Sequence, residues 1–472
     1  MALLEKLITV SNDVLWSYVL VFMLIALGLF FSLRTGFVQL RMLGEMIRLL
    51  KEGVSHDGGR AHISSFQAFC ISTASRVGVG NIAGIAIAIM VGGPGAVFWM
   101  WVIAVIGAAS GFTESTLAQI YKVRDPKTFG FRGGPAYYIR NCLGSSRAAA
   151  LFAVLISITF GLCFNSVQSN TISLSLNATF GMDRALAGAF VTMLSAVVIF
   201  GGLKRIAHLS SWLVPVMATL YLLLALIIIL MNITHVPAML VTIVTQAFHP
   251  DAAVGGIGAA ILTGAKRGLF SNEAGMGSVP NAAATAFVSH PVKQGLVQAL
   301  GVFVDTLLVC TASACIVLLF DGYADTGKTG IELVQLSLTT QLGSPAGILL
   351  AVMVFMFAFS SIAGNYYYGE SNIQFFSTRP VYLFIFRIMV VGMVAFGSVA
   401  ELPFVWNLAD LFMALMAIVN LIAITLLGRN AFIALKDYQA QKKAGVIDPV
   451  FHPEMLADRH GIEVWGSTTD RS

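Results

Sequence analysis

Long apolar runs recur along almost the whole chain and are separated by short polar segments. A helix needs about 20 apolar residues to cross the hydrocarbon core of a bilayer, so these runs can be counted as spans. One overlong run is divided at Gly92-Gly-Pro-Gly95, a turn signal. The pattern predicts eleven helices, at about 14–33, 66–90, 95–113, 148–182, 185–203, 211–231, 254–286, 294–320, 345–368, 380–400 and 404–428.

The composition agrees with a bilayer as the solvent. Of the 472 residues, 57% are hydrophobic and 11% are charged, whereas soluble domains carry about 25% charged residues. A soluble fold of this size could not cover its surface with so few charges. This excludes soluble enzymes, nucleic-acid-binding proteins and disordered proteins, despite the net charge of +5. We therefore expect an all-α, polytopic membrane protein that is not an enzyme.

The basic residues are unevenly divided between the two sides. If the N-terminus is outside, 22 of the 28 Lys and Arg residues lie in inside loops or in the C-terminal tail, and only Lys6, Arg184 and Lys328 lie outside. Loops rich in Lys and Arg stay on the cytoplasmic side. The distribution predicts an outside N-terminus, a cytoplasmic C-terminus and an odd number of spans.

These patterns divide the chain into five parts. We expect an N-terminal tail with an extra helix at 1–34, a cytoplasmic segment at 35–65 and a polar C-terminal tail at 429–472. In the cytoplasmic segment, Leu40, Leu43, Ile47 and Leu50 share one helical face, which predicts an amphipathic helix on the membrane surface. The tail is expected to be a helical extension with a loose end. The remaining spans form two sets of five, at 66–231 and 232–428, the second beginning with an outer connecting loop.

Two glycine-rich clusters interrupt spans, at 75–84 and at 268–278. Irregular backbone at membrane depth is tolerated only where it is buried in protein or lines a cavity. Each cluster lies in the first helix of one set of five, and since five is odd the second set is inverted relative to the first. This arrangement is typical of inverted-repeat secondary transporters with a site at the membrane midplane. Free N–H groups at such a break suit a carboxylate, and free carbonyl groups suit sodium.

Ionisable residues also lie at membrane depth: Arg76, Lys266, Arg267, Glu273 and Asp305. Such groups usually face a bundle interior or a cavity. One interpretation is structural, in which Glu273 or Asp305 pairs with Arg76 or Arg267. The alternative is that Glu273 and Asp305 act in gating or proton movement, and both interpretations stay open for these two carboxylates.

Several segments together resemble the alanine or glycine:cation symporter family. They are Arg76-Val-Gly-Val-Gly-Asn-Ile-Ala-Gly84, Gly92-Gly-Pro-Gly-Ala-Val-Phe-Trp-Met-Trp101, Gly133-Gly-Pro-Ala-Tyr-Tyr-Ile139, Gly268-Leu-Phe-Ser-Asn-Glu-Ala-Gly-Met-Gly-Ser278 and Phe359-Ser-Ser-Ile-Ala-Gly-Asn-Tyr-Tyr-Tyr-Gly-Glu370. The resemblance implies a five-plus-five inverted-repeat fold like that of the bacterial leucine transporter, with one extra N-terminal helix. It also implies sodium-coupled uptake of a small amino acid across a bacterial cytoplasmic membrane.

The resemblance further implies a set of site residues. Those expected to meet the substrate are Val77, Gly78, Asn81, Gln168, Ser271 and Asn365. Ser360 and Ser361 match the hydroxyl pair that would hold sodium, together with backbone carbonyl groups near Ser75 and Arg76.

The chain departs from the family pattern at two positions. Alanine-type members carry Trp where this chain has Asn365, and Arg76 stands where many members have an uncharged residue. Replacing an indole with an amide removes bulk and adds hydrogen-bonding groups. We therefore expect glutamine to be a candidate substrate beside alanine and glycine.

The predicted function is sodium-coupled symport of a small neutral amino acid, with no organic cofactor, no nucleic acid and no obligatory protein partner. The alternative is a proton-coupled amino-acid carrier that uses Asp305 or Glu273. A channel is less favoured, because two interrupted helices in corresponding positions do not make a symmetric selectivity filter.

Overall fold

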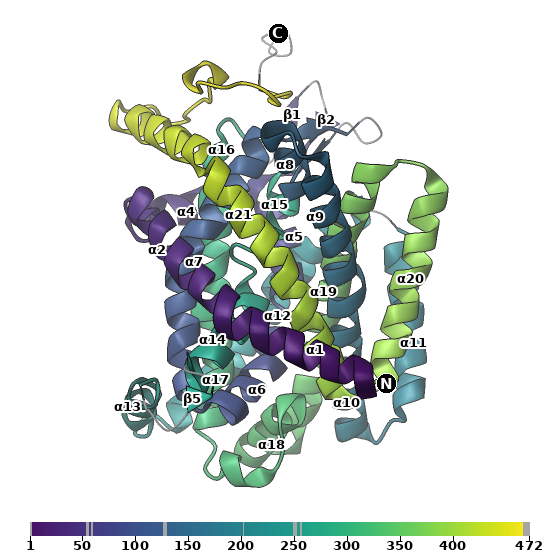
Figure 1. Ribbon diagram of the computed structural model, residues 1–472. Coiled ribbons are helices and arrows are strands. Elements are labelled where there is room, and N and C mark those ends of the chain that lie inside the picture. Colours follow the sequence, from purple (N-terminus) through teal and green to yellow (C-terminus); the bar gives the residue numbers. More distant parts are fainter. Residues whose placement is uncertain are drawn as a thin grey trace.

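The computed structural model describes residues 2–52, 56–57, 60–125, 130–201, 203–248, 253–254 and 257–465. Helices make up the molecule, and most of them run along a common direction to form a bundle (Figure 1). Within these residues, eight helices are long and apolar enough to cross a membrane, and the bent pair α5 (Ser65–Arg76) and α6 (Ala83–Gly92) makes a ninth. The only sheets in the described ranges are three hairpins whose strands have two residues each. They are β1–β2 (His56–Asp57, Arg60–Ala61), β3–β4 (Val123–Arg124, Phe131–Arg132) and β5–β6 (Ala253–Val254, Ile257–Gly258).

The helices after the N-terminal segment form two sets with the same order. After α5 and α6, the first set contains α7 (Gly95–Ile120), α8 (Pro135–Leu143), α9 (Ser146–Ile158), η3 (Thr159–Phe164), α10 (Asn165–Phe180), α11 (Arg184–Ile199) and α12 (Leu203–Met231). The second contains α14 (Ala259–Asn272), α15 (Val279–Ala283), α16 (Pro291–Val302), η5 (Phe303–Cys310), α17 (Thr311–Leu318), α18 (Gly330–Leu342), α19 (Ser344–Phe376), α20 (Pro380–Val399) and α21 (Leu402–Lys443).

The two sets are inverted relative to each other. Each begins with an interrupted helix and has one short helix between its second and third spans, which is α8 in the first set and α18 in the second. These two short helices lie at opposite ends of the bundle (Figure 1). The predicted five-plus-five inverted arrangement is therefore present. One further short helix, α13 (Val236–Gln246), lies in the connection between the sets.

The extra N-terminal helix packs against the last long helix. It consists of α1 (Ala2–Val14), the π-helical turn η1 (Leu15–Leu20) and α2 (Val21–Arg34). The side-chain amide of Asn12 donates to the carbonyl of Asn407 at 2.8 Å, and the indole of Trp16 donates to the carbonyl of Asp410 at 3.2 Å. Both acceptors lie on α21, so these bonds fix where the extra helix crosses the bundle.

Some predicted elements differ in length. The spans expected at 185–203 and 254–286 are short helices here, since α11 has 16 residues and α14 has 14. The amphipathic segment forms two helices, α3 (Val38–Arg41) and α4 (Leu43–Leu50). Leu40, Leu43 and Ile47 are exposed, whereas Met46 and Leu49 are fully buried against the bundle.

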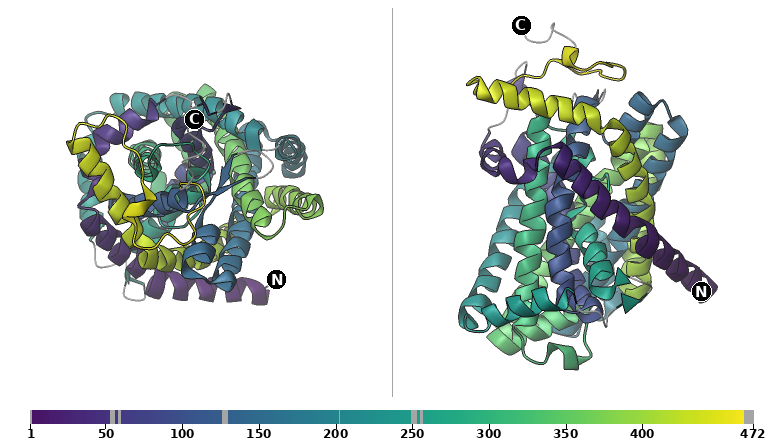
Figure 2. Two further views of the ribbon diagram at one scale, coloured as in Figure 1. Left: turned by 90° about the horizontal axis from the view of Figure 1, so that it is seen from above. Right: turned by 60° about the vertical axis from the view of Figure 1, so that its left-hand side comes forward.

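The prediction of a loose C-terminal end is wrong as far as Trp465. Residues 446–465, which include η7 (Pro453–Met455), lie across one end of the bundle (Figure 2), and we call this end the tail face. The Phe451 N–H donates to the carbonyl of Ser289 at 3.0 Å, and the Trp465 indole donates to the carbonyl of Gln119 at 2.8 Å. The last residues, 466–472, lie outside the described ranges.

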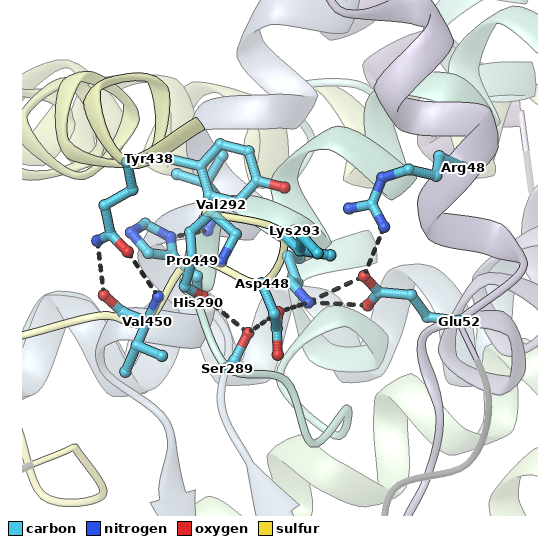
Figure 3. Close-up of polar contacts among 12 residues, drawn as sticks. Arg48, Glu52, Ser289, His290, Val292, Lys293, Tyr438, Asp448, Pro449 and Val450 are labelled. Carbon is cyan, nitrogen blue, oxygen red and sulfur yellow. Dashed lines mark hydrogen bonds and ion pairs between the residues drawn. The ribbon is translucent and has the colours of Figure 1, made fainter. Parts of the chain in front are cut away.

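Charged side chains tie the tail to the rest of this face. Lys293 lies between two carboxylates, with its Nζ 2.9 Å from Glu52 and 2.5 Å from Asp448 (Figure 3). Arg48 and Glu45 form an ion pair at 2.8 Å on α4, and this contact, together with the hydroxyl of Tyr438, lowers the pKa of Glu45 to about 2. The tail face is thus a connected polar network between α4, the start of α16 and the tail.

Candidate functional site

The first interruption lies between α5 and α6, where the segments Ser65–Arg76 and Val79–Gly92 are bent by 61° relative to each other. The α-helix ends at Arg76, Val77 leaves the helical conformation, Gly78 is extended, and η2 (Val79–Asn81) makes one tight turn before α6 begins. All of these residues are buried. Because their N–H groups cannot reach water, their partners define what the break can bind.

The oxygens of two neutral side-chain amides accept hydrogen bonds from the free N–H groups of this break. The Gly78 N–H donates to Oδ1 of Asn81 at 3.1 Å, and the Val79 N–H donates to Oε1 of Gln168 at 3.2 Å. A Cβ atom at Gly78 would lie 2.4 Å from the Ser361 hydroxyl and 3.0 Å from the Gln168 amide. Glycine therefore allows three predicted site residues, on α5–α6, α10 and α19, to meet at one point.

A second group surrounds the Asn81 side chain. Its amide donates to the Ser271 hydroxyl at 3.0 Å and to the Asp305 carboxylate, and the Ser271 hydroxyl donates to the other Asp305 oxygen at 2.8 Å. The Cys310 thiol lies 3.0 Å from the Ser271 hydroxyl. Asn81, Ser271 and Asp305 were predicted separately, and the structure brings them together from the two interrupted helices and η5.

The second interruption lies between α14 and α15. Glu273, Gly275 and Gly277 have positive φ angles of 56°, 84° and 88°, so the chain turns sharply here. The N–H groups of Gly275 and Gly277 both donate to the Glu114 carboxylate at 3.1 Å. Asn420 donates to the same carboxylate at 2.7 Å. Charge-assisted bonds of this kind are stronger than neutral ones, so this turn is firmly held.

Sequence reasoning assigned no role to Glu114 or Asn420. Glu114 is fully buried on α7, and Asn420 also donates to the carbonyl of Gly275 at 2.8 Å. A single carboxylate inside an apolar run is a readable signal of an internal partner. An asparagine on α21 has no such signal, because amides occur at many helix interfaces.

Asn365 lies in a chain of polar contacts beside the first break. The Ser75 hydroxyl lies 2.6 Å from Oδ1 of Asn365 and 3.0 Å from Oε1 of Glu273. The Asn365 amide donates to Oδ1 of Asn165 at 3.1 Å, and the Ser278 hydroxyl donates to Glu273 at 2.5 Å. Asn365 and Glu273 therefore share one polar wall with Asn165, which the sequence did not suggest.

The two serines expected to hold sodium differ in their contacts. The Ser361 hydroxyl donates to the carbonyl of Ala74 at 2.9 Å, at the end of the first interrupted helix. The Ser360 hydroxyl bonds within its own helix, to Phe357 at 2.9 Å, and faces the sulfur of Met217 at 3.6 Å. A hydroxyl and a carbonyl oxygen of this kind are suitable sodium ligands, and the carbonyl in contact belongs to the residue before Ser75.

The predicted ion pairs of Glu273 or Asp305 with Arg76 or Arg267 are wrong. Arg267 pairs instead with Asp410 on α21 and lies 4.6 Å from the Trp406 ring centroid. Arg76 donates to Gln298 at 2.8 Å and to Ser72 at 3.0 Å, and no carboxylate within the described ranges is close enough to pair with it. The physical reason is the direction of the Arg76 side chain, because its guanidinium lies against Gly301 of α16.

An aromatic layer covers the first break on the side away from the tail face. The ring of Phe270 stacks on Phe164 at 4.4 Å and contacts Trp406 at 4.7 Å between centroids. A Cβ atom at Gly80 would lie 2.4 Å from the Phe270 ring, so this ring rests directly on the break. The layer continues to the Arg267–Asp410 pair and closes this side of the site.

Known proteins resemble this chain over almost its whole length. The sequence profile of the sodium:alanine symporter family matches residues 1–453. The chain is 54% identical to the probable sodium/glutamine symporter GlnT of Bacillus subtilis (98% of this chain, 96% of the relative) and 50% identical to its amino-acid carrier protein AlsT (98% and 97%). It is 36% identical to the sodium/alanine symporter AgcS of Methanococcus maripaludis (89% and 94%).

A solved structure shows the same fold. The structure of MhsT in complex with L-phenylalanine aligns with a TM-score of 0.57 at 13% identity, covering 82% of this chain and 99% of that one. The chain belongs to the sodium:alanine symporter family and is, by that membership, a sodium-coupled amino-acid symporter.

Proposed function

We propose that this transporter imports glutamine, with alanine and glycine as the smaller alternatives, and that the substrate carboxylate binds at the first interruption. The observation that carries the proposal is the difference in partners between the two breaks. The Val79 N–H is held by the neutral amide of Gln168, whereas the N–H groups of the second break are held by the Glu114 carboxylate. An incoming carboxylate can displace an amide oxygen, but not a buried carboxylate of like charge.

The polar wall beside this break supports an amide side chain as cargo. Asn365 and Asn165 each offer both a donor and an acceptor, and their amides lie in contact with each other and with Ser75. A substrate carboxamide could replace these mutual bonds one for one. The relative with 54% identity is named a probable sodium/glutamine symporter, and this name also supports glutamine as the substrate.

Two clusters are suitable for sodium. The first consists of the Ser361 hydroxyl and the Ala74 carbonyl, with Ser360 and the carbonyls of Ser75 and Arg76 nearby in sequence. The second consists of the carboxylate of Asp305, the hydroxyl of Ser271 and the side chain of Asn81. Around them, Glu114, Glu273 and Asp305 are buried with one guanidinium, Arg76. This excess of acidic groups favours a bound cation.

The same carboxylates support a second candidate, in which a proton is the coupling ion. Asp305 and Glu273 are both fully buried and hydrogen-bonded to hydroxyls. Measuring uptake by Asp305→Asn and Glu273→Gln under a sodium gradient and under a proton gradient separates the candidates. We expect both variants to lose sodium-driven uptake. Uptake by the unmodified chain that is driven by a proton gradient without sodium, and that is lost in these variants, would favour the second candidate.

The orientation and the repeat boundaries belong to the same proposal. We place the tail face in the cytoplasm and the N-terminus outside, because the basic loops gather on the tail face. The parts are then 1–34, 35–65, 66–231, 232–428 and 429–472, as predicted, in a bacterial cytoplasmic membrane. No catalytic chemistry, organic cofactor or obligatory protein partner is part of the proposal.

The deciding experiment is uptake into proteoliposomes of the purified chain with labelled glutamine, alanine and glycine. An imposed sodium gradient should drive accumulation of glutamine above that of the other two. Accumulation without sodium would overturn the choice of ion, and a preference for alanine would overturn the choice of substrate.

A further inference from the structure

A deep groove lies on the outer surface of the bundle between α9, α19 and α20. It has a volume of about 610 Å³, which is in the range of small-molecule sites. Its walls are mostly apolar and include Val154, Ile158, Phe376, Ile385 and Met389, and Arg379 lies at one end. The helix α20 stands at the edge of the bundle (Figure 1) and is the least buried of the eight long apolar helices, at 28%.

Across the membrane, the groove is about as long as one leaflet is thick. It begins at the tail face, where α19 ends at Phe376 and α20 begins at Pro380, and it extends along α20 to Met389. The ten helical residues from Pro380 to Met389 extend over about 15 Å. This is half of the roughly 30 Å hydrocarbon thickness of a bilayer. An acyl chain of the adjacent leaflet has the length and the polarity to fill it.

The tail-face end of the groove carries positive charge. Arg379 is exposed, and within the described residues no ion pair engages its guanidinium. Arg147 lies two helical turns before Val154, on the same face of α9, and is also exposed. Basic pockets between membrane helices at this depth bind anionic lipid headgroups. We infer that the groove is a binding site for an anionic glycerophospholipid, with its phosphate at Arg379 and an acyl chain along α20.

The site is connected to the transport machinery through Phe386. The ring of Phe386 lines the groove, and Cβ atoms at Gly161 and Gly369 would lie 2.5 and 2.3 Å from it. Gly369 is one helical turn from Asn365, and the Gly161 carbonyl accepts from Asn165 at 3.1 Å. A lipid in the groove therefore presses on the two helices that carry the proposed substrate residues, so occupancy should change uptake.

The test measures lipid retention, which does not depend on the proposed substrate or ion. The chain is purified from vesicles that contain phosphatidylglycerol and phosphatidylcholine, and co-purified lipid is quantified by mass spectrometry. We expect phosphatidylglycerol to be enriched. Arg379→Gln should reduce that enrichment about fivefold, the factor expected for one basic residue near an anionic surface. Ile385→Trp should displace both lipids by filling the groove.

Two matched variants serve as controls. Ile388→Trp places the same bulk on the lipid-exposed face of α20, where Ile388 is 52% exposed and outside the groove. Arg429→Gln removes another exposed basic residue at the tail face. Neither should alter retention. Equal retention of the two lipids by the unmodified chain, or retention unchanged by both Arg379→Gln and Ile385→Trp, would overturn the inference. Because Arg379 is exposed, its replacement does not threaten folding.

Discussion

At the first interruption, the N–H groups of Gly78 and Val79 meet the amide oxygens of Asn81 and Gln168, and at the second, those of Gly275 and Gly277 meet the carboxylate of Glu114. Both breaks expose the same backbone groups at membrane depth. At the second break a buried carboxyl group of the protein accepts from them, whereas at the first break two side-chain amides do so.

This difference separates two uses of an interrupted helix. A buried carboxylate with two backbone donors and one amide donor is costly to disturb, so the second break serves as a fixed support. The first break keeps its positive end available to a ligand, since an amide oxygen is a weaker partner than a carboxylate. In the proposed function, substrate binding and structural support thus belong to different breaks.

The largest expected effect comes from making the first break resemble the second. Gln168→Glu places a carboxylate against the Val79 N–H, and two like charges at one site cost several kcal/mol. Uptake should fall by about a thousandfold, with no loss of thermal stability. The measurement is uptake together with the substrate-induced shift in melting temperature. Gln168→Met, which removes the amide without adding charge, should cost only about tenfold, and equal losses in the two variants would refute the anion site.

The converse change weakens the second break. Glu114→Gln keeps the shape but removes the charge that holds Gly275 and Gly277. The free energy of unfolding should fall by about 3 kcal/mol, because bonds to a charged acceptor contribute about 1.5–3 kcal/mol each. Thermal unfolding in detergent measures this. Ser115→Ala is the control, since the adjacent Ser115 hydroxyl is buried and has no hydrogen-bond partner among the described residues. A normal melting temperature in Glu114→Gln would contradict the supporting role.

A smaller effect concerns what the first break selects. Asn365→Trp removes the amide beside Ser75 and places a bulky indole there. The ratio of alanine to glutamine uptake should rise by about tenfold, which is the discrimination that one pocket contact provides. Competition between labelled alanine and unlabelled glutamine measures the ratio. An unchanged substrate profile would remove Asn365 from the specificity of the site.

The smallest expected effect is on stability at the tail face, which the chain reaches after the second break. Burial lowers the pKa of His290, which follows the segment after α15 and packs between the rings of Tyr438 and Phe451. A lowered folded pKa means that stability is fully present above about pH 6.5 and is lost as pH falls below it. Between about pH 7.5 and about pH 6 the loss should be about 1 kcal/mol. In His290→Gln the same pH change should have no effect, and a persistent pH dependence would exclude this residue as its source.

The sequence predicted the positions of both breaks because irregular, glycine-rich backbone at membrane depth occurs only where it is buried in protein or lines a cavity. It also predicted residues that gather near the first break, and most of them, such as Asn81, Ser271 and Ser361, lie in the long family-like motifs. Their partners were harder to predict, since Gln168 reaches Val79 across 89 residues and Glu114 reaches Gly275 across 161. The sequence placed Arg267 at the right depth in the membrane but assigned it the wrong acidic partner. Periodicity predicts which face of a helix is buried, and it does not predict which helix packs against that face. The packing of residues 446–465 on the tail face could not be predicted, because this segment has no periodic pattern of apolar residues.

The contacts of the extra N-terminal helix have a consequence for synthesis. Asn12 and Trp16 find their acceptors on α21, 395 and 394 residues later, and Arg267 finds its acid on the same helix. A chain still on the ribosome therefore holds the first half of its N-terminal helix without these two acceptors, and a buried guanidinium without a counter-ion, until the last helix enters the membrane. Unpaired charge at this depth is unfavourable. Insertion of α21 is thus the step that completes the fold, and a chain truncated before it lacks both contacts at once.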